Sequence, residues 1–215
     1  MIVSAVIPFP NIYWWLQVAE ADKVAFDLAE HFEKMTYRNK YFITGANGGI
    51  QLSIPLKKGR GQRTPMGDVE IDNSQRWQVQ HWRTLVSVYK RSAYFEHYEA
   101  LLQPLFEQEY GKLSDFNLAS IQWLKKQLGL KFEEKMVNIY KHSYEEGDTD
   151  LRNALKPGME HTGIEGIEPY YQLFSDRNGF LPNLSMLDLL FAEGPHAMQW
   201  AKNNRTLIKG WVAKK

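Results

Sequence analysis

The sequence predicts an α/β fold: a small, largely parallel sheet opened by a strand-turn-helix-strand unit, with a β-hairpin and a helix-rich second half. Two apolar runs near the amino terminus, 2–7 and 23–28, have the length and composition of buried strands. Alternating apolar residues flank an Asn-Gly-Gly turn at 47–49. Three consecutive segments between residues 74 and 129 carry apolar residues at helical spacing.

The first 28 residues have the order strand, turn, helix, strand, which opens a βαβ unit. Pro8-Phe9-Pro10 closes the first strand as a rigid turn, and Asn11 is a candidate N-cap for the following helix. Units of this kind place ligands at the carboxyl ends of their strands. These ends fall around residues 8–11 and around Asp27 to Glu30.

Residues 41–56 predict the hairpin, because Asn-Gly between alternating hydrophobic residues is the strongest short-range hairpin signal. Cationic residues flank both of its ends, and the basic loop from Lys57 to Arg63 follows it. A rigid element with basic residues at its open end is suited to holding an anion. A well-solvated sheet edge would have the same pattern, and the loop has no Walker A motif.

The central segment predicts three helices. After a short strand candidate at 68–72, the first helix starts at Ser74 and carries Trp77, His81 and Tyr89 on one face. The second helix covers 94–108 and bends at Pro104. Ser114 is the expected cap of the third helix, which stops at Gly129.

The last third predicts a strand within 135–140, an acidic turn at 145–150 and an extended segment at 168–174. Ser185 and Asp188 form a capping pattern before an apolar run, and a final amphipathic helix follows Gly194-Pro195. We expect a single domain over 1–215, with an α/β part at 1–72, three helices at 74–130 and a mixed part at 131–215.

Composition narrows the classes of function. With 44% hydrophobic and 24% charged residues, the chain has the composition of a soluble globular protein. A formal charge of +1 disfavours nucleic acid as a partner. The absence of cysteine excludes disulfides and thiolate metal sites, and the six histidines show no metal-ligand spacing. The amino terminus lacks a signal peptide and a membrane-length apolar run. We therefore expect a cytoplasmic protein with no cofactor and no membrane insertion.

Arg38, Asn39 and Lys40 are the strongest candidates for substrate binding. The two cations would bind a phosphate or carboxylate, and Asn39 would orient a sugar hydroxyl. The alternative is a solvated strand entry in which the asparagine satisfies local backbone groups.

Asp27 and His81 are the candidate catalytic residues, each as a general base. Asp27 ends a predicted strand, where a carboxylate would also serve as an ordinary helix-start acid. His81 lies beside Trp77 and Tyr89, and a buried histidine satisfied by a neighbour is its commoner alternative.

An ordered set of short motifs resembles the WbqC-like family of bacterial proteins. The resemblance covers residues 3 to 130 and 168 to 200. It is carried by AEAD at 19–22, FDLAEHF at 26–32, YRNKYFI with its NGG turn, SIPLKKG, DVEIDN, YKRSAYF, LSDFNL and PNLSMLDLLF.

This resemblance implies a role in O-antigen or other surface-polysaccharide synthesis, as aminoacyl or acyl transfer onto an amino-sugar nucleotide. Arg38 and Lys40 would then bind the anionic part of the substrate, while His81 or Asp27 deprotonates the attacking amine. The remaining expected contacts to this small molecule come from Asn39, Trp77, Tyr89 and Asp188, the last of which is first a capping carboxylate.

The chain departs from the family pattern in two places. The family's first strand typically ends in His-Gln-Pro, where this chain has Val6-Ile7-Pro8. Residues 140–167 are also too short for the further strand-helix-strand module of the family. Both departures favour the alternative of a non-catalytic binding or scaffold protein that keeps the fold without the chemistry.

Overall fold

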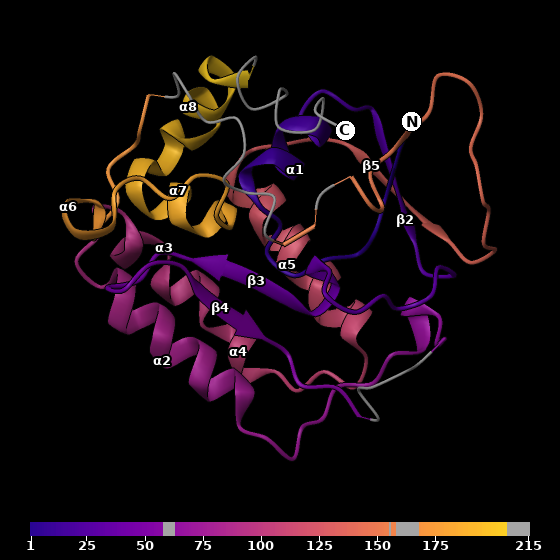
Figure 1. Ribbon diagram of the computed structural model, residues 1–215, viewed down its shortest axis with the longest axis horizontal. Helices are drawn as coiled ribbons and strands as arrows, with labels where there is room; N and C mark the ends of the chain where they lie inside the picture. The colour runs from indigo at the N-terminus through magenta and orange to yellow at the C-terminus, as the bar shows by residue number, and fades with distance from the viewer. Residues whose placement is uncertain (58–62, 155, 158–167, 206–215) are drawn as a thin grey trace.

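The computed structural model describes residues 1–57, 63–154, 156–157 and 168–205, and the larger of its two sheets is parallel. The strand order is β5-β2-β1-β6, and every neighbouring pair is parallel. The strands are β1 (Ile2–Ser4), β2 (Lys23–Asp27), β5 (Glu133–Val137) and β6 (Thr149–Asp150). The predicted α/β class with a mainly parallel sheet is confirmed (Figure 1).

The opening unit forms as predicted, with a shorter first strand. β1 ends at Ser4, and Pro8 and Pro10 follow it without backbone N–H groups to extend a strand ladder. Phe9 between them has a positive φ of 39° and is fully buried. Helix α1 (Ile12–Val18) then begins after its N-cap, Asn11, whose side chain accepts from the Trp14 amide.

The hairpin is confirmed as a separate two-stranded antiparallel sheet of β3 (Lys40–Ile43) and β4 (Ile50–Ser53). Tyr41 faces Leu52 across the pair, and both side chains are buried. Gly48 supplies the positive φ, 104°, that the reversal of the chain requires. A 3-10 turn, η1 (Tyr37–Asn39), leads into the hairpin.

The three central helical segments are observed at nearly the predicted positions. They are α2 (Trp77–Tyr89), α3 (Phe95–Leu102) with α4 (Pro104–Glu107), and α5 (Leu113–Gln127). The second segment breaks at the predicted proline, which cannot donate an intrahelical hydrogen bond. In Figure 1, α2 runs along the hairpin on the side away from the parallel sheet.

Three local predictions were wrong. Residues 68–72 form no strand: the 3-10 turn η2 (Met66–Asp68) is followed by isolated bridges at Glu70 and Ile71. Helix α2 begins at Trp77, because Ser74 instead binds the Asp72 carboxylate through its amide and hydroxyl. Lys112 is the N-cap of α5, so Ser114 lies inside that helix.

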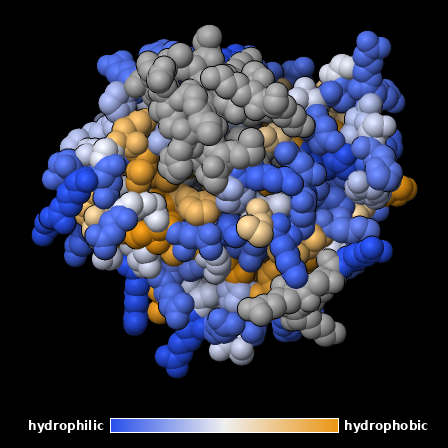
Figure 2. All heavy atoms as spheres, viewed as in Figure 1, coloured by the Kyte–Doolittle hydropathy of each residue, from blue (hydrophilic) through white to orange (hydrophobic). Residues whose placement is uncertain are grey.

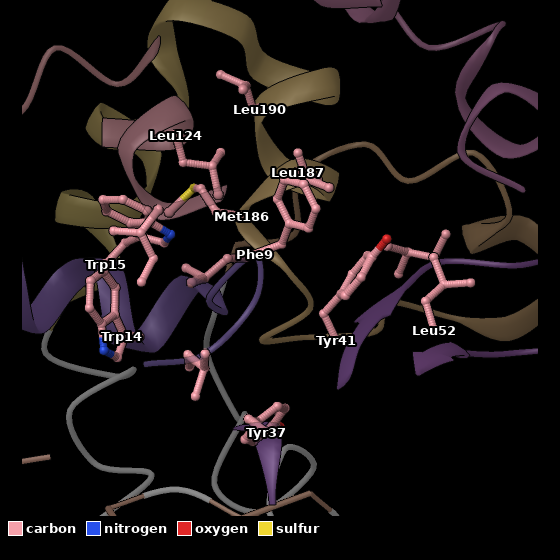
Figure 3. Packing of buried hydrophobic residues seen from close by; sticks show 14 of the residues in the cluster. Phe9, Trp14, Trp15, Tyr37, Tyr41, Leu52, Leu124, Met186, Leu187 and Leu190 are labelled. Carbon is pink, nitrogen blue, oxygen red and sulfur yellow. The ribbon is translucent and has the colours of Figure 1, made fainter. Parts of the chain in front are cut away.

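The last described segment consists of short helices: α6 (Ser175–Asn178), α7 (Met186–Glu193), η3 (Gly194–His196) and α8 (Ala197–Asn203). Trp15, Leu124 and Met186, from α1, α5 and α7, lie together in the buried core (Figure 3). Figure 2 shows a face covered mostly by polar and charged residues, with smaller hydrophobic areas between them. None of the helices in the described residues is long and apolar enough to span a membrane.

The sheet has a switch point between β1 and β6. From β1 the strand order runs outward through β2 to β5, and the chain then returns to pair β6 with the opposite side of β1. In open parallel sheets, ligands bind outside the carboxyl ends of the strands near such a point. We therefore look for a ligand site beside the segments that follow Ser4, Asp27 and Asp150.

Candidate functional site

Two buried ion pairs meet at the carboxyl ends of the strands. Asp27 ends β2 and accepts a hydrogen bond of 2.8 Å from Arg152, which follows β6 by two residues. Glu30 accepts two hydrogen bonds from Arg38, one of 3.0 Å at Oε1 and one of 2.6 Å at Oε2. All four residues are buried. The pairs bring β2, β6 and η1 together at one edge of the sheet.

The Asp27 carboxylate is fully occupied by protein groups. Oδ1 accepts from the amides of Ala29 and Glu30, each at 2.9 Å, and so shapes the turn after β2. Oδ2 accepts from Arg152 and, at 3.5 Å, from the Tyr144 hydroxyl. Asp27 therefore contacts protein groups and holds the Arg152 side chain in place.

A hollow of about 420 Å³ opens beside these pairs. Its volume lies in the range of about 300–1,000 Å³ that is typical of small-molecule sites. A much smaller cavity, of only about 30 Å³, lies on the β1 side of the same two arginines. We therefore take the larger one as the candidate site. Its charged and polar lining is Glu30, His31, Glu33, Arg38, His142, Asp150, Arg152 and Asn153.

The ionisation of the site is set by burial and by the arginines. Burial raises the pKa of Glu30, although its contacts with Arg38 oppose the increase. Burial also tends to raise the pKa of Asp150, but the Arg152 hydrogen bonds outweigh it and the pKa is lowered. The same hydrogen bonds raise the pKa of Arg152. Arg152 and Asp150 are therefore both charged at neutral pH and offer fixed hydrogen-bonding groups to a polar ligand.

Of the residues predicted from the sequence, Arg38 lines this hollow and Asp27 lies behind it through Arg152. Asn39 lies at the base of the hairpin, where its side chain donates to the carbonyl of Ile54 at 3.0 Å. Lys40 is the first residue of β3 and is partly exposed. Neither Asn39 nor Lys40 lines the candidate site.

His81 lies in the core. Its Nδ1 is 3.2 Å from the Tyr41 hydroxyl and its Nε2 is 3.2 Å from the carbonyl oxygen of Ser53. Burial lowers its pKa to about 4, so the ring is neutral at pH 7. Trp77 packs edge-on against the imidazole, with ring centroids 5.2 Å apart. His81 joins α2 to the hairpin, Trp77 packs against Phe116 of α5, and neither residue lines the candidate site.

Tyr89 and Asp188 belong to another buried cluster. Asp188 accepts hydrogen bonds from the Tyr89 hydroxyl, from Tyr170 at 2.7 Å and from Gln172 at 2.9 Å. Burial raises its pKa, although these hydrogen bonds act in the opposite direction. Of the predicted capping pattern, the Ser185 hydroxyl caps α7 as expected, but the Asp188 carboxylate takes no part, because the Ser185 amide donates to the Phe42 carbonyl. Asp188 instead joins α2, α7 and the 170–172 segment.

Sequence reasoning missed Arg152, the central cation of the site. It lies in a part of the chain with no clear periodicity, so no local pattern distinguished it from other arginines. Glu30 had a usable signal, since it follows the predicted strand end at Asp27 within the FDLAEHF motif. Most of the basic loop at 57–63 falls outside the described residues.

The amino end of α1 is closed to a phosphate. Ile12, Tyr13 and Trp14 donate their amides to Leu184 O, Asn183 Oδ1 and Asn11 Oδ1, at 2.9–3.1 Å. Parallel α/β proteins often bind phosphate at the helix that follows the first strand, through amides that lack protein partners. Here those amides are satisfied within the protein.

No group of three or more metal-binding side chains of suitable geometry is found within the described residues. The arginines and carboxylates that line the candidate site can bind polar groups through charge-assisted hydrogen bonds.

Fold and site together define a parallel α/β protein with a polar cleft at the carboxyl ends of its strands. The sequence profile of the WbqC-like protein family matches residues 8–157, and the chain belongs to this family. The matched region contains β2, β5, β6, the hairpin, α1 to α5 and both ion pairs, whereas β1 precedes it.

One relative has a sequence of similar length. The protein named "Uncharacterized protein Rv1507c" of Mycobacterium tuberculosis is 24% identical over 200 residues, which cover 80% of this chain and 84% of the relative. No solved structure gives a significant match.

Proposed function

We propose that this protein binds a small polar metabolite in the candidate site, and that this metabolite is an amino-sugar nucleotide. The observation that carries the proposal is the 420 Å³ hollow at the strand ends, bordered by Arg38 and Arg152. The reaction we propose is acyl or aminoacyl transfer to the sugar amine, in the synthesis of a surface polysaccharide. The resemblance of the sequence motifs to WbqC-like proteins supports the proposed transfer reaction.

The charge balance of the site supports an amine-bearing ligand. Arg38 is paired with Glu30, and Arg152 with Asp27 and Asp150. Glu33 is near the guanidinium of Arg38, at 3.8 Å, and pairs with the half-exposed Lys156 at 3.2 Å. Among these described groups, four carboxylates face three cations. In this proposal Arg38 holds Glu30 in place, and the surplus carboxylate attracts the amine.

A non-catalytic binding role is the second candidate, and one observation favours it. Both bases expected from the sequence, Asp27 and His81, have their polar atoms occupied by protein groups. If neither is released on ligand binding, the protein holds its metabolite without converting it.

The test is ligand binding with a variant that fills the hollow. Asn153 is exposed and lines the site, so Asn153→Trp should block it without removing an ion pair. Asn203→Trp, on the exposed face of α8, is the matched control. UDP-glucosamine should raise the melting temperature of the wild type and the control, but not of Asn153→Trp.

A second experiment distinguishes the two candidate functions. UDP-glucosamine is incubated with the protein and an activated acyl or aminoacyl donor. The mass of the nucleotide sugar is then measured by mass spectrometry. A gain in mass by one acyl group supports the transferase. Binding without any product supports the binding role, and the absence of any thermal shift would overturn both.

A further inference from the structure

A second large hollow, of about 790 Å³, lies against the candidate site. The two share a wall formed by the segment after β5, which loops out at the right edge of Figure 1. Residues in this wall alternate: Tyr140 and His142 line the candidate site, while Ile139, Lys141 and Ser143 line the second hollow. The wall is therefore only one residue thick, and an elongated molecule that lies across it would contact both hollows.

The second hollow carries unpaired positive charge. Lys135 and Lys141 both line it, and within the described residues no carboxylate lies within salt-bridge distance of either ammonium group. The terminal ammonium of Met1 is already paired with Asp148 at 3.1 Å. Glu145 is the other acid in the lining, and Asn138 and Ser143 add neutral hydrogen-bonding groups. Such a lining suits a multiply charged anion.

Two other places within the described residues where a phosphate would be expected are occupied. The amides at the start of α1 are satisfied by protein acceptors. The guanidinium groups of Arg38 and Arg152 are matched by buried carboxylates. A diphosphate bound beside the candidate site would thus meet Lys135 and Lys141, neither of which pairs with a carboxylate in the described part of the chain.

We propose that the second hollow is a phosphate-binding site, and that it holds the diphosphate of a nucleotide sugar whose amine-bearing ring occupies the candidate site. This inference rests on the proposed function and adds the place and the residues of phosphate recognition. The two lysines act as point charges, so the binding should weaken as salt screens them.

The test compares two double variants with the same change in net charge. Lys135→Gln/Lys141→Gln removes both cations of the second hollow. Lys90→Gln/Lys126→Gln removes two exposed cations from α2 and α5 regions outside it. All four lysines are exposed, so the variants should fold with stabilities close to that of the wild type.

Isothermal titration with UDP and with UDP-glucosamine gives the readout. We expect the first double variant to bind both probes about tenfold or more weakly, because it loses two charge-assisted contacts. The control should stay within about twofold of the wild type. Raising the salt concentration should weaken binding to the wild type and the control more than to the first variant.

The outcomes distinguish the two proposals. If UDP-glucosamine binds and the first double variant matches the control, the phosphate site is wrong while the proposed function stands. If the wild type binds neither probe, the nucleotide-sugar function itself is overturned, and the phosphate site with it.

Discussion

The imidazole of His81 shows how burial changes the meaning of a residue that looks catalytic in the sequence. Both ring nitrogens face protein atoms at 3.2 Å, and 4% of the residue is exposed. A base that must take a proton from a substrate needs access to it, whereas this ring is held between Tyr41 and Ser53. We infer that its main contribution is to fix α2 on the hairpin.

This placement predicts a pH dependence of stability. The folded pKa of about 4 lies below the ordinary value of 6.5, so the unfolded chain binds the proton more readily than the folded one between these values. His81 therefore destabilises the fold as the pH drops from 6.5 to 4, by up to about 1.4 kcal/mol per pH unit.

The measurement is the free energy of unfolding by urea at pH 7, 6, 5 and 4 for the wild type and His81→Gln. The variant should be less stable at pH 7, because the two hydrogen bonds are disturbed, and should lose less stability on acidification. Parallel curves for the two proteins would show that the pKa of His81 is the same in the folded and the unfolded chain.

The carboxyl end of α7 shows how a turn depends on one glycine. Gly194 ends the helix with a positive φ of 54°, and its amide donates to the carbonyl of Leu190. A Cβ at this position would lie 2.5 Å from the Tyr94 ring. The close approach lets Tyr94 donate its amide to Phe191 and so joins α3 to α7.

Gly194→Ala should therefore lower the free energy of unfolding by about 1–3 kcal/mol, from backbone strain and from the contact with the ring. Gly111→Ala is the matched control, because a Cβ there meets no atom within 4 Å. Its effect should stay within about 0.5 kcal/mol. Equal effects of the two substitutions in urea unfolding would contradict the role assigned to Gly194.

At the scale of the whole molecule, Arg152 ties together parts of the chain that are distant in sequence. Its guanidinium pairs with Asp27 at the end of β2, donates to the carbonyls of Lys141 and His142, and lies over the rings of Tyr140 and Tyr144. Arg152 thus attaches the shared wall of the two hollows to the sheet, together with the Tyr144 hydroxyl, which donates to Asp27. This attachment couples the shape of the site to a buried ion pair.

Arg152→Gln should reduce the free energy of unfolding by about 3–5 kcal/mol, because it leaves Asp27 buried without its cation. Amide hydrogen exchange in residues 138–148 should accelerate as well. Lys112→Gln, which removes an exposed ion pair with Asp68, serves as the control and should cost at most about 1 kcal/mol.

A double-mutant cycle completes this test. Adding Asp27→Asn to Arg152→Gln should cost less than the sum of the two single changes, since the second substitution removes the uncompensated charge. Strict additivity, or unchanged exchange in 138–148, would mean that Arg152 does not anchor the wall.

Local patterns in the sequence were sufficient for most of the elements. The apolar run before Pro8 predicted β1, the Asn11 cap predicted the start of α1, and the Asn-Gly-Gly turn predicted the hairpin. Helical periodicity located α2 to α5. The errors at Ser74 and Asp188 concern side chains that bind other neighbours than predicted, whereas Ser114 lies inside a helix that begins one residue before it. A capping motif in the sequence shows which side-chain hydrogen bonds are possible. Which of them form depends on the groups that the surrounding structure places nearby.

The sequence by itself determined the α/β class, the order of the main elements and the family resemblance, because all three depend on residues close together in the chain. Only the tertiary structure decided which polar residues form the site. It placed Arg152 beside Asp27, 125 positions away, and enclosed His81 and Asp188 in the core. The physical reason is that the availability of a charged or titratable group depends on its burial and its partners, and those are set by contacts between distant segments.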